Sequence, residues 1–294
     1  MTYISSLILA VIGNIASKAM EMGIDKVAFH APPSNTLEYS NINPICYCLM
    51  KDEPDTKIAM CMFEPKNEKD KTLCKFTKLD TVIIYSHGNS EDIFSISYDC
   101  QRMATELNQF ILCYDYVGYG KSSPGVTTEV NLHSAIESVY DYAKGHLKAK
   151  NVILMGRSIG TAPTIYLSSM PDKYSHNGVI LLSPLASGVR TLTISHYLPE
   201  KVVSNLDKIF MPSLEYIKKT KVPILLIHGQ QDKVVAVDNT HDLYKNIPSK
   251  QKTLPVLLGT RQHPVGHNDL LSKEFQIVAS KIDNFIKSSC ELKP

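Results

Sequence analysis

Short apolar runs alternate with segments of helical periodicity from Thr81 onward. Six apolar runs, rich in β-branched residues, lie at 82–86, 111–115, 151–155, 179–183, 224–228 and 254–258. Segments with an apolar residue at every third or fourth position lie at 96–107, 132–140 and 271–286. Short strands that alternate with helices are typical of βαβ units. The pattern therefore predicts a mostly parallel central sheet flanked by helices.

Two further apolar runs precede this pattern, at 45–50 and 58–63. The chain around them is rich in proline, asparagine and charged residues. Short runs bounded by residues of these types are typical of strands. We therefore expect an antiparallel edge on the central sheet.

The first residues form an amphipathic pattern. Apolar side chains recur at helical spacing from Ile4 to Ala19, and serine, asparagine and Lys18 fall mostly on the other side. The pattern predicts an amphipathic helix within residues 1–30. This helix either packs over the core or the substrate mouth, or makes peripheral membrane contact through residues 1–20. A cleaved signal peptide is a third alternative, which the lack of a positively charged N-terminal stretch disfavours.

One interval is too long for a single helix and its turns. It runs from about residue 186 to 221 and separates two predicted strands. In doubly wound sheets the ligand site lies beyond the carboxyl ends of the strands. An insertion at that edge would overhang the site, so we expect a short cap that helps to define the substrate pocket.

The composition is that of an ordinary globular protein and excludes several partner classes. The chain has 294 residues, of which 44% are hydrophobic and 20% charged, so residues 31–294 can form one domain. The net charge of +2, without a long basic run, disfavours a nucleic-acid partner. Seven cysteines, an odd number, favour free thiols over a disulfide framework, and Cys46 and Cys48 lack the companions of a zinc site. No apolar run approaches the roughly 18 to 20 residues that span a membrane.

The most informative motif is Gly156-Arg-Ser158-Ile-Gly160. It directly follows the run at 151–155 and precedes a helix-compatible segment at 161–170. A Gly-x-Ser-x-Gly sequence between a strand and a helix is the nucleophile elbow of the α/β-hydrolase fold. The sharp turn exposes the serine hydroxyl, and glycines avoid collisions with the neighbouring strand and helix. We therefore predict this fold, with Ser158 as nucleophile.

A nucleophilic serine needs a base, and the base needs an orienting carboxylate. In this fold these groups follow in the order serine, acid, histidine. Asp232 lies in the loop after the run at 224–228, and His267 lies in the loop after the last run. Asp238 and His263 are the alternatives, although Asp238 is better explained as a helix N-cap and His263 is constrained by the proline after it. His228 and His241 are interpreted as a locally bonded strand-end residue and a surface helix residue.

The oxyanion of a tetrahedral intermediate needs two hydrogen-bond donors. One is expected from the backbone N–H of Ile159, the residue after the nucleophile. The second is expected from the His87-Gly88 turn after the first parallel strand, through the N–H of Asn89 or Ser90, with Asn89 favoured. This chemistry requires no metal and no organic cofactor.

Several motifs together resemble those of one family. They are SHGNSED at 86–92, DYVGYG at 115–120, GRSIGT at 156–161, SPLASGVR at 183–190, DKI at 207–209 and GHND at 266–269. In this order and spacing they resemble the α/β-hydrolase domain-containing protein 17 family, over about residues 40–290. Members of that family usually carry lipidated cysteines at the N-terminus, whereas the first cysteine here is Cys46.

The resemblance implies a serine thioesterase that removes palmitate from cysteines of membrane-bound proteins on the cytoplasmic face. It assigns Ser158, Asp232 and His267 the roles reached above. An acylated protein or a lipid ester is the expected substrate, and the expected location is the cytoplasm or the cytoplasmic face of a membrane. A carboxylesterase or lipase, a serine peptidase and a non-catalytic membrane-associated binding module are the alternatives, because fold alone does not fix the substrate.

Overall fold

The computed structural model describes residues 28–33, 44–66, 80–191 and 200–291. The predicted N-terminal helix lies outside these residues except for 28–30. No helix within the described ranges has the length and apolar character that crossing a bilayer requires.

The described residues contain one eight-stranded sheet of order β1-β2-β4-β3-β5-β6-β7-β8. Its first three members pair antiparallel, as the apolar runs before Thr81 predicted, and the remaining pairs are parallel. The strands are β1 (Ile45–Leu49), β2 (Lys57–Phe63), β3 (Thr81–Ser86), β4 (Phe110–Tyr114), β5 (Asn151–Arg157), β6 (Gly178–Leu182), β7 (Ile224–Gly229) and β8 (Val256–Leu258).

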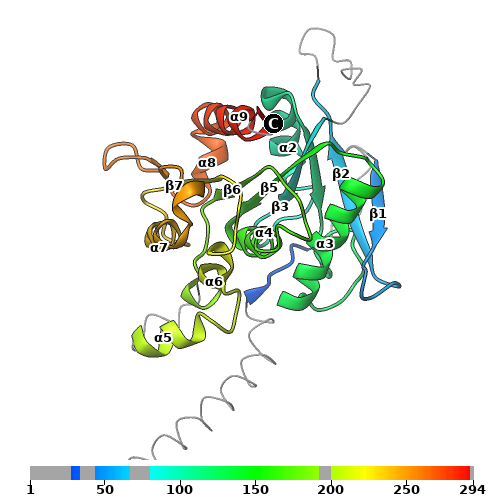
Figure 1. Cartoon of the computed structure of the whole chain (residues 1–294), viewed down its shortest axis with the longest axis horizontal. Coiled ribbons are helices and arrows are strands. Elements are labelled where there is room, and N and C mark those ends of the chain that lie inside the picture. The colour runs from blue at the N-terminus through cyan, green and yellow to red at the C-terminus, as the bar shows by residue number, and fades with distance from the viewer. Residues whose placement is uncertain (1–27, 34–43, 67–79, 192–199, 292–294) are drawn as a thin grey trace, which may run out of the picture.

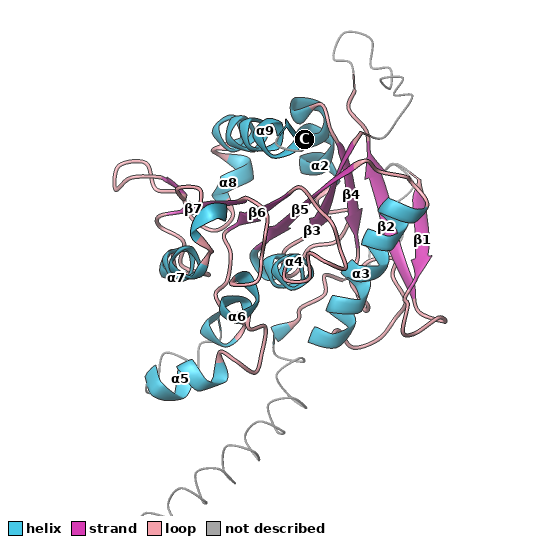
Figure 2. Cartoon of the chain, in the orientation of Figure 1, coloured by secondary structure: helices cyan, strands magenta, loops and turns pink. Residues whose placement is uncertain are grey.

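Helices cover both faces of the sheet (Figures 1 and 2). One face carries α2, α8 and α9, whereas α3, α4, α6 and α7 pack together on the other. The described helices are α2 (Ser97–Leu107), α3 (Glu129–Gly145), α4 (Thr161–Ser168), α5 (Glu200–Leu206), α6 (Ser213–Ile217), α7 (Asp238–Asn246), α8 (Asp269–Ser272) and α9 (Phe275–Glu291). This is the predicted α/β-hydrolase fold.

The alternation of side chains along each strand divides the core into two layers. In β3, Val82 and Ile84 face the layer under α3 and α4, whereas Ile83 and Tyr85 face the layer under α2 and α9. Successive strand residues point to opposite faces, so a strand buried on both faces is apolar throughout. The continuous apolar runs in the sequence therefore correspond to central strands. The carboxyl ends of the parallel strands lie along one edge of the sheet.

Two predicted elements differ from the structure. The last strand begins at Val256, not at residue 254, because Pro255 has no N–H to pair and Leu254 is exposed. The predicted helix at 271–286 is divided into α8 and α9 between Ser272 and Phe275. Its apolar periodicity continues across that break, so periodicity alone did not reveal it.

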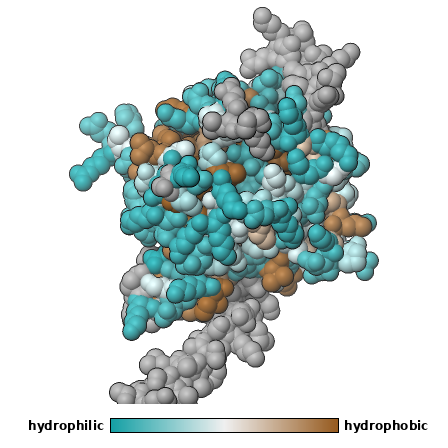
Figure 3. Space-filling model, in the orientation of Figure 1, coloured by the Kyte–Doolittle hydropathy of each residue, from teal (hydrophilic) through white to brown (hydrophobic). Residues whose placement is uncertain are grey.

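The long interval between β6 and β7 contains α5 and α6. Both lie toward the lower end of the molecule in Figure 1, and one of the apolar patches that Figure 3 shows on this face lies toward the same end. Phe210 and Met211, between the two helices, line a cavity that reaches Ser158. The segment thus contributes to the wall of the candidate site.

Candidate active site

Ser158 lies on the turn between β5 and α4. Its backbone adopts the left-handed conformation, with φ of +52°. A non-glycine residue in this region costs of order 1 to 3 kcal/mol, which the surrounding packing must offset. The turn places the serine at the carboxyl edge of the sheet, where the loops after neighbouring strands converge.

The two glycines of the motif are required by close contacts. A Cβ atom on Gly160 would lie 2.2 Å from the carbonyl oxygen of Ser86, and one on Gly156 would lie 2.5 Å from the carbonyl oxygen of Gly160. Both obstructing atoms belong to the backbone, so the obstruction cannot rotate away. The two glycines of the motif are therefore explained by the close packing of α4 against β3 and β5.

Ser158, His267 and Asp232 form one chain of hydrogen bonds. His267 Nε2 lies 2.9 Å from Ser158 Oγ, and His267 Nδ1 lies 2.7 Å from Asp232 Oδ2. With the proton on Nδ1, this nitrogen donates to the carboxylate and Nε2 accepts from the serine hydroxyl. The three residues proposed from chain order therefore meet at one edge of the sheet.

Asp232 is held as an ionised acceptor. Its side chain is fully buried, and Oδ1 accepts the N–H groups of Val234 and Val235 at 2.8 Å. Burial acts to raise the pKa of Asp232. Hydrogen bonds from His228, His267 and the Val235 N–H outweigh burial and hold this pKa well below its usual value.

His228 is a second histidine on the same carboxylate. Its Nε2 lies 2.9 Å from the carbonyl oxygen of Val235 and 3.2 Å from Asp232 Oδ2, and its Nδ1 lies 2.6 Å from Thr240 Oγ1. Because a carbonyl oxygen only accepts, Nε2 carries a proton. The interpretation as a locally bonded strand-end residue omitted the contact with Asp232, which the four-residue separation in sequence could have indicated.

The alternative residues lie elsewhere. His263 is exposed and belongs to a tight turn in which its N–H donates to Thr260 Oγ1. Asp238 is also exposed and is the first residue of α7. It is not the N-cap that the sequence predicted, since Val237 occupies that position and makes no side-chain cap.

Asn89 and Ile159, the predicted oxyanion donors, both line the cavity beside Ser158. The Asn89 side chain is fixed by contacts from three directions. Its Oδ1 accepts from the His30 N–H at 2.9 Å and the Tyr119 hydroxyl at 2.7 Å, and its Nδ2 donates to the Ala28 carbonyl at 2.7 Å. The last residues of the predicted N-terminal helix thus bind this loop directly.

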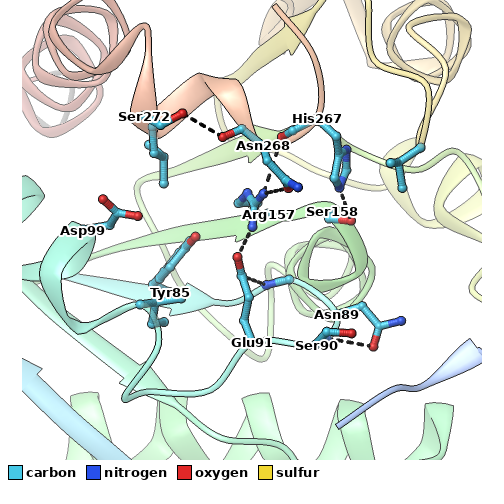
Figure 4. Close-up of a pocket in the computed structure, with 14 residues that line it drawn as sticks. Tyr85, Asn89, Ser90, Glu91, Asp99, Arg157, Ser158, His267, Asn268 and Ser272 are labelled. Carbon is cyan, nitrogen blue, oxygen red and sulfur yellow. Dashed lines mark hydrogen bonds and ion pairs between the residues drawn. The ribbon is translucent and has the colours of Figure 1, made fainter. Parts of the chain in front are cut away.

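Arg157, which precedes the nucleophile, joins three loops (Figure 4). It pairs with Glu91, and its Nη2 donates to Asn268 Oδ1 at 2.7 Å and to the His267 carbonyl at 3.4 Å. Glu91 Oε2 in turn accepts the Gly88 N–H at 2.6 Å. Sequence reasoning missed this connection because its members lie up to 111 residues apart.

Two cavities meet at Ser158. The smaller, of 170 Å³, is walled mainly by apolar residues, including Ile159, Leu185 and Phe210. The larger, of 560 Å³, has a mixed wall, in which the charged residues Glu91, Asp99 and Arg157 lie among apolar residues such as Ile96 and Leu271. Asn89, Ser158 and Val234 line both cavities. Among the described residues no cluster of three or more histidine, cysteine or acidic side chains could hold a metal ion.

Comparison with known proteins agrees with this architecture. A family model described as "alpha/beta hydrolase fold" matches residues 81–194, and one described as "Serine aminopeptidase, S33" matches residues 192–263. The chain is 32% identical over 219 residues to α/β-hydrolase domain-containing protein 17C of Xenopus tropicalis, a match that covers 72% of this chain and 66% of that protein. It is 30% identical over 216 residues to human α/β-hydrolase domain-containing protein 17B, covering 71% of this chain and 69% of that protein.

The chain belongs to the α/β-hydrolase domain-containing protein 17 family. It spans slightly less than two thirds of the length of the 17C relative. Among solved structures, an esterase of Pyrococcus furiosus matches with a TM-score of 0.63 and 18% identity, covering 89% of this chain and all of that one. Mouse α/β-hydrolase domain-containing protein 10 matches with a TM-score of 0.61 and 14% identity, covering 83% of this chain and 99% of that one. At these identities the likeness is one of fold.

Proposed function

We propose that this member of the family is a serine hydrolase that cleaves long-chain acyl thioesters and so removes fatty acyl groups from protein cysteines. The observation that carries the proposal is the hydrogen-bonded chain from Asp232 through His267 to Ser158, positioned where a mainly apolar cavity meets a larger one that has charged residues in its wall. An acyl thioester likewise has two different parts, a fatty chain and a thiol carrier, which lie on opposite sides of the reacting carbonyl. Each part can therefore occupy one of the two cavities.

The first half of the proposed reaction transfers the acyl group to the enzyme. Ser158 Oγ attacks the thioester carbonyl carbon while His267 Nε2 takes the hydroxyl proton. The backbone N–H groups of Asn89 and Ile159 donate to the resulting oxyanion. When the intermediate collapses, the C–S bond breaks, and His267 returns the proton to the departing thiol.

The second half repeats these steps with water. His267 accepts a proton from a water molecule, whose oxygen attacks the ester carbonyl of the acyl-enzyme. Collapse of the second intermediate releases the fatty acid and restores the Ser158 hydroxyl. Asp232 remains ionised throughout and stabilises the imidazolium that forms in each half.

The apolar cavity supports an acyl group as the part of the substrate that Ser158 receives, and the N-terminal pattern supports delivery of that substrate at a membrane. Ala28 and His30 line the apolar cavity together with Ser158. The polypeptide that follows the amphipathic pattern therefore passes beside the proposed nucleophile. A helix of residues 4–19 lying on the cytoplasmic face of a membrane would bring this cavity near lipid-attached substrates.

Active-site labelling tests the nucleophile. A fluorophosphonate probe should label the wild-type protein, and Ser158→Ala should abolish labelling. The base is tested by the matched pair His267→Ala and His263→Ala, of which the first should lower turnover by several orders of magnitude and the second should leave it unchanged. Labelling that persists in Ser158→Ala overturns the assignment.

A substrate panel tests the acyl linkage. The purified protein is compared on a palmitoyl-cysteine peptide, short p-nitrophenyl esters and a peptide amide. We expect the highest kcat/KM for the thioester. The family model described as a serine aminopeptidase favours the amide as the alternative, so faster cleavage of the amide would reassign the protein as a peptidase.

A further inference from the structure

The larger cavity at Ser158 has walls suited to the part of a substrate that leaves. Ser158 and His267 lie at one end, and Tyr85, Asp99 and Ser272 line its other parts (Figure 4). Its volume of 560 Å³ lies within the range of small-molecule and side-chain pockets. Because the apolar cavity shares little of this wall, an acyl group and its carrier can occupy separate spaces.

The charge of Arg157 is already balanced within the cavity wall. Glu91 pairs with one side of the guanidinium, and Asn268 Oδ1 accepts from the other at 2.7 Å. Glu91 also accepts the Gly88 N–H, so both of its carboxylate oxygens have donors. An anionic ligand would have to compete with these contacts, and Arg157 therefore does not make the cavity an anion site.

Asp99 is the acidic side chain of this wall that no hydrogen bond or ion pair among the described residues holds in place. It lies in the first turn of α2 and is half-buried, and Figure 4 shows its carboxylate and the Tyr85 hydroxyl directed into the same space. No residue that the structure describes forms a hydrogen bond or ion pair with the Asp99 carboxylate. Burial, followed by repulsion from Glu91, raises the pKa of Asp99, and the smaller attraction of Arg157 and Arg102 does not cancel this rise. A cation bound against the carboxylate would favour its ionised form and so offset both effects.

Resting on the proposed thioesterase function, we infer that this cavity binds the carrier side of the substrate and that Asp99 selects a carrier with a lysine or arginine beside the acylated cysteine. The carboxylate accepts from the ammonium or guanidinium group of the carrier. Ser158 and Asp99 line the same cavity, so the acylated cysteine and its cationic neighbour would occupy it together.

The test compares two palmitoyl-cysteine peptides that differ only in lysine or glutamine next to the acylated cysteine. We expect the wild-type protein to show a kcat/KM for the lysine peptide about fivefold above that for the glutamine peptide, the size of a half-exposed charge pair. Asp99→Asn should bring this ratio close to one, mainly through a higher KM for the lysine peptide. Asp238→Asn, which removes an exposed acid outside the cavity, should keep the wild-type ratio.

The outcomes separate this inference from the function on which it rests. If both peptides are cleaved but Asp99→Asn retains the wild-type ratio, or the wild-type ratio is one, the cavity has no cation selectivity and Asp99 serves only the first turn of α2. If the wild-type protein cleaves neither peptide, the thioesterase function fails and this inference fails with it. Thermal melts of each variant verify that the compared proteins are folded.

Discussion

Asp232 determines which nitrogen of His267 carries a proton. Replacement by asparagine keeps an oxygen for the N–H groups of Val234 and Val235 but turns an N–H₂ group toward His267 Nδ1. That nitrogen must then accept, so the proton moves to Nε2, which can no longer accept from Ser158. We expect Asp232→Asn to lower kcat by about 10⁴-fold, as the wrong tautomer does in serine proteases.

The control for this substitution is Asp238→Asn, because Asp238 is the nearby alternative acid and is exposed. The kcat of this variant should equal that of the wild-type protein when all three proteins are measured on one short p-nitrophenyl ester. Equal losses in the two variants would contradict the assignment of Asp232.

The lowered pKa of Asp232 predicts how stability depends on pH. Because this pKa is lower in the folded than in the unfolded chain, the unfolded chain binds more protons at acid pH. The stabilisation is therefore complete above the unfolded pKa, near 4, and is lost as pH falls toward the folded pKa. We expect the free energy of unfolding in urea to differ most between wild type and Asp232→Asn at pH 7, and this difference should become smaller as the pH is lowered to 3. A constant gap would contradict the lowered pKa.

Arg157 has a structural role and a positioning role that substitutions can separate. Arg157→Met leaves the largely buried Glu91 carboxylate unpaired, which should lower the free energy of unfolding by about 3 kcal/mol. Adding Glu91→Gln removes the uncompensated charge and should recover most of this stability. Turnover should stay low in the double variant, because Asn268 and the His267 carbonyl have still lost their donor.

Urea unfolding and kcat/KM of the two single variants and the double variant provide this measurement. Recovery of turnover together with stability would show that Arg157 acts only through the fold.

At the scale of elements, the elbow depends on how closely α4 approaches β3. Gly160→Ala places a methyl group against two backbone carbonyls, at 2.2 and 2.5 Å, so α4 must move away. We expect a loss of about 3 kcal/mol in stability, the upper range of overpacking, and of at least about 100-fold in turnover. Gly145→Ala, at the end of α3 with open space around the added methyl group, should instead stabilise the protein by up to about 1 kcal/mol. Equal melting temperatures for both variants would contradict this account.

Most elements could be predicted from the sequence because a strand buried on both faces must be apolar throughout. The runs at 82–86 and 151–155 lie within β3 and β5, and the elbow follows β5 directly. Periodicity could not locate the break between α8 and α9, because the apolar positions continue across it. The apolar run at 254–258 also predicted a last strand that begins two residues too early. The residues of an edge strand need not be buried on both faces, so their sequence pattern marks its ends poorly.

Chain order and loop position could likewise predict Ser158, Asp232 and His267, because this fold fixes which loops meet at its carboxyl edge. The sequence could not predict the contacts of Arg157 with Glu91 and Asn268. Nor could it predict the contacts of Asn89 with residues 28–30. They join loops distant in sequence through side chains that have no required spacing. Polar groups of this kind become recognisable only when the folded chain brings their partners together.

At the scale of the whole molecule, residues 28–33 lie between the amphipathic pattern at 4–19 and the cavity beside Ser158. Ala28 and His30 wall the apolar cavity and bind Asn89. Deleting residues 1–27 should abolish binding to phosphatidylcholine vesicles while turnover of a soluble short ester stays within about twofold of wild type. Because Lys18 is the one charged residue in 4–19, vesicle binding by the full chain should change little with salt.

Deleting residues 1–33 removes the contacts with Asn89 as well. The loop that is proposed to hold one oxyanion donor then loses its anchor, so turnover of the same soluble ester should fall by at least about tenfold, since losing such a donor outright costs roughly 100- to 1,000-fold. The two deletions thus separate membrane attachment from the order of the active site. Vesicle binding that survives the shorter deletion would locate the anchor elsewhere, and full turnover after the longer one would show that residues 28–33 merely lie beside the cavity.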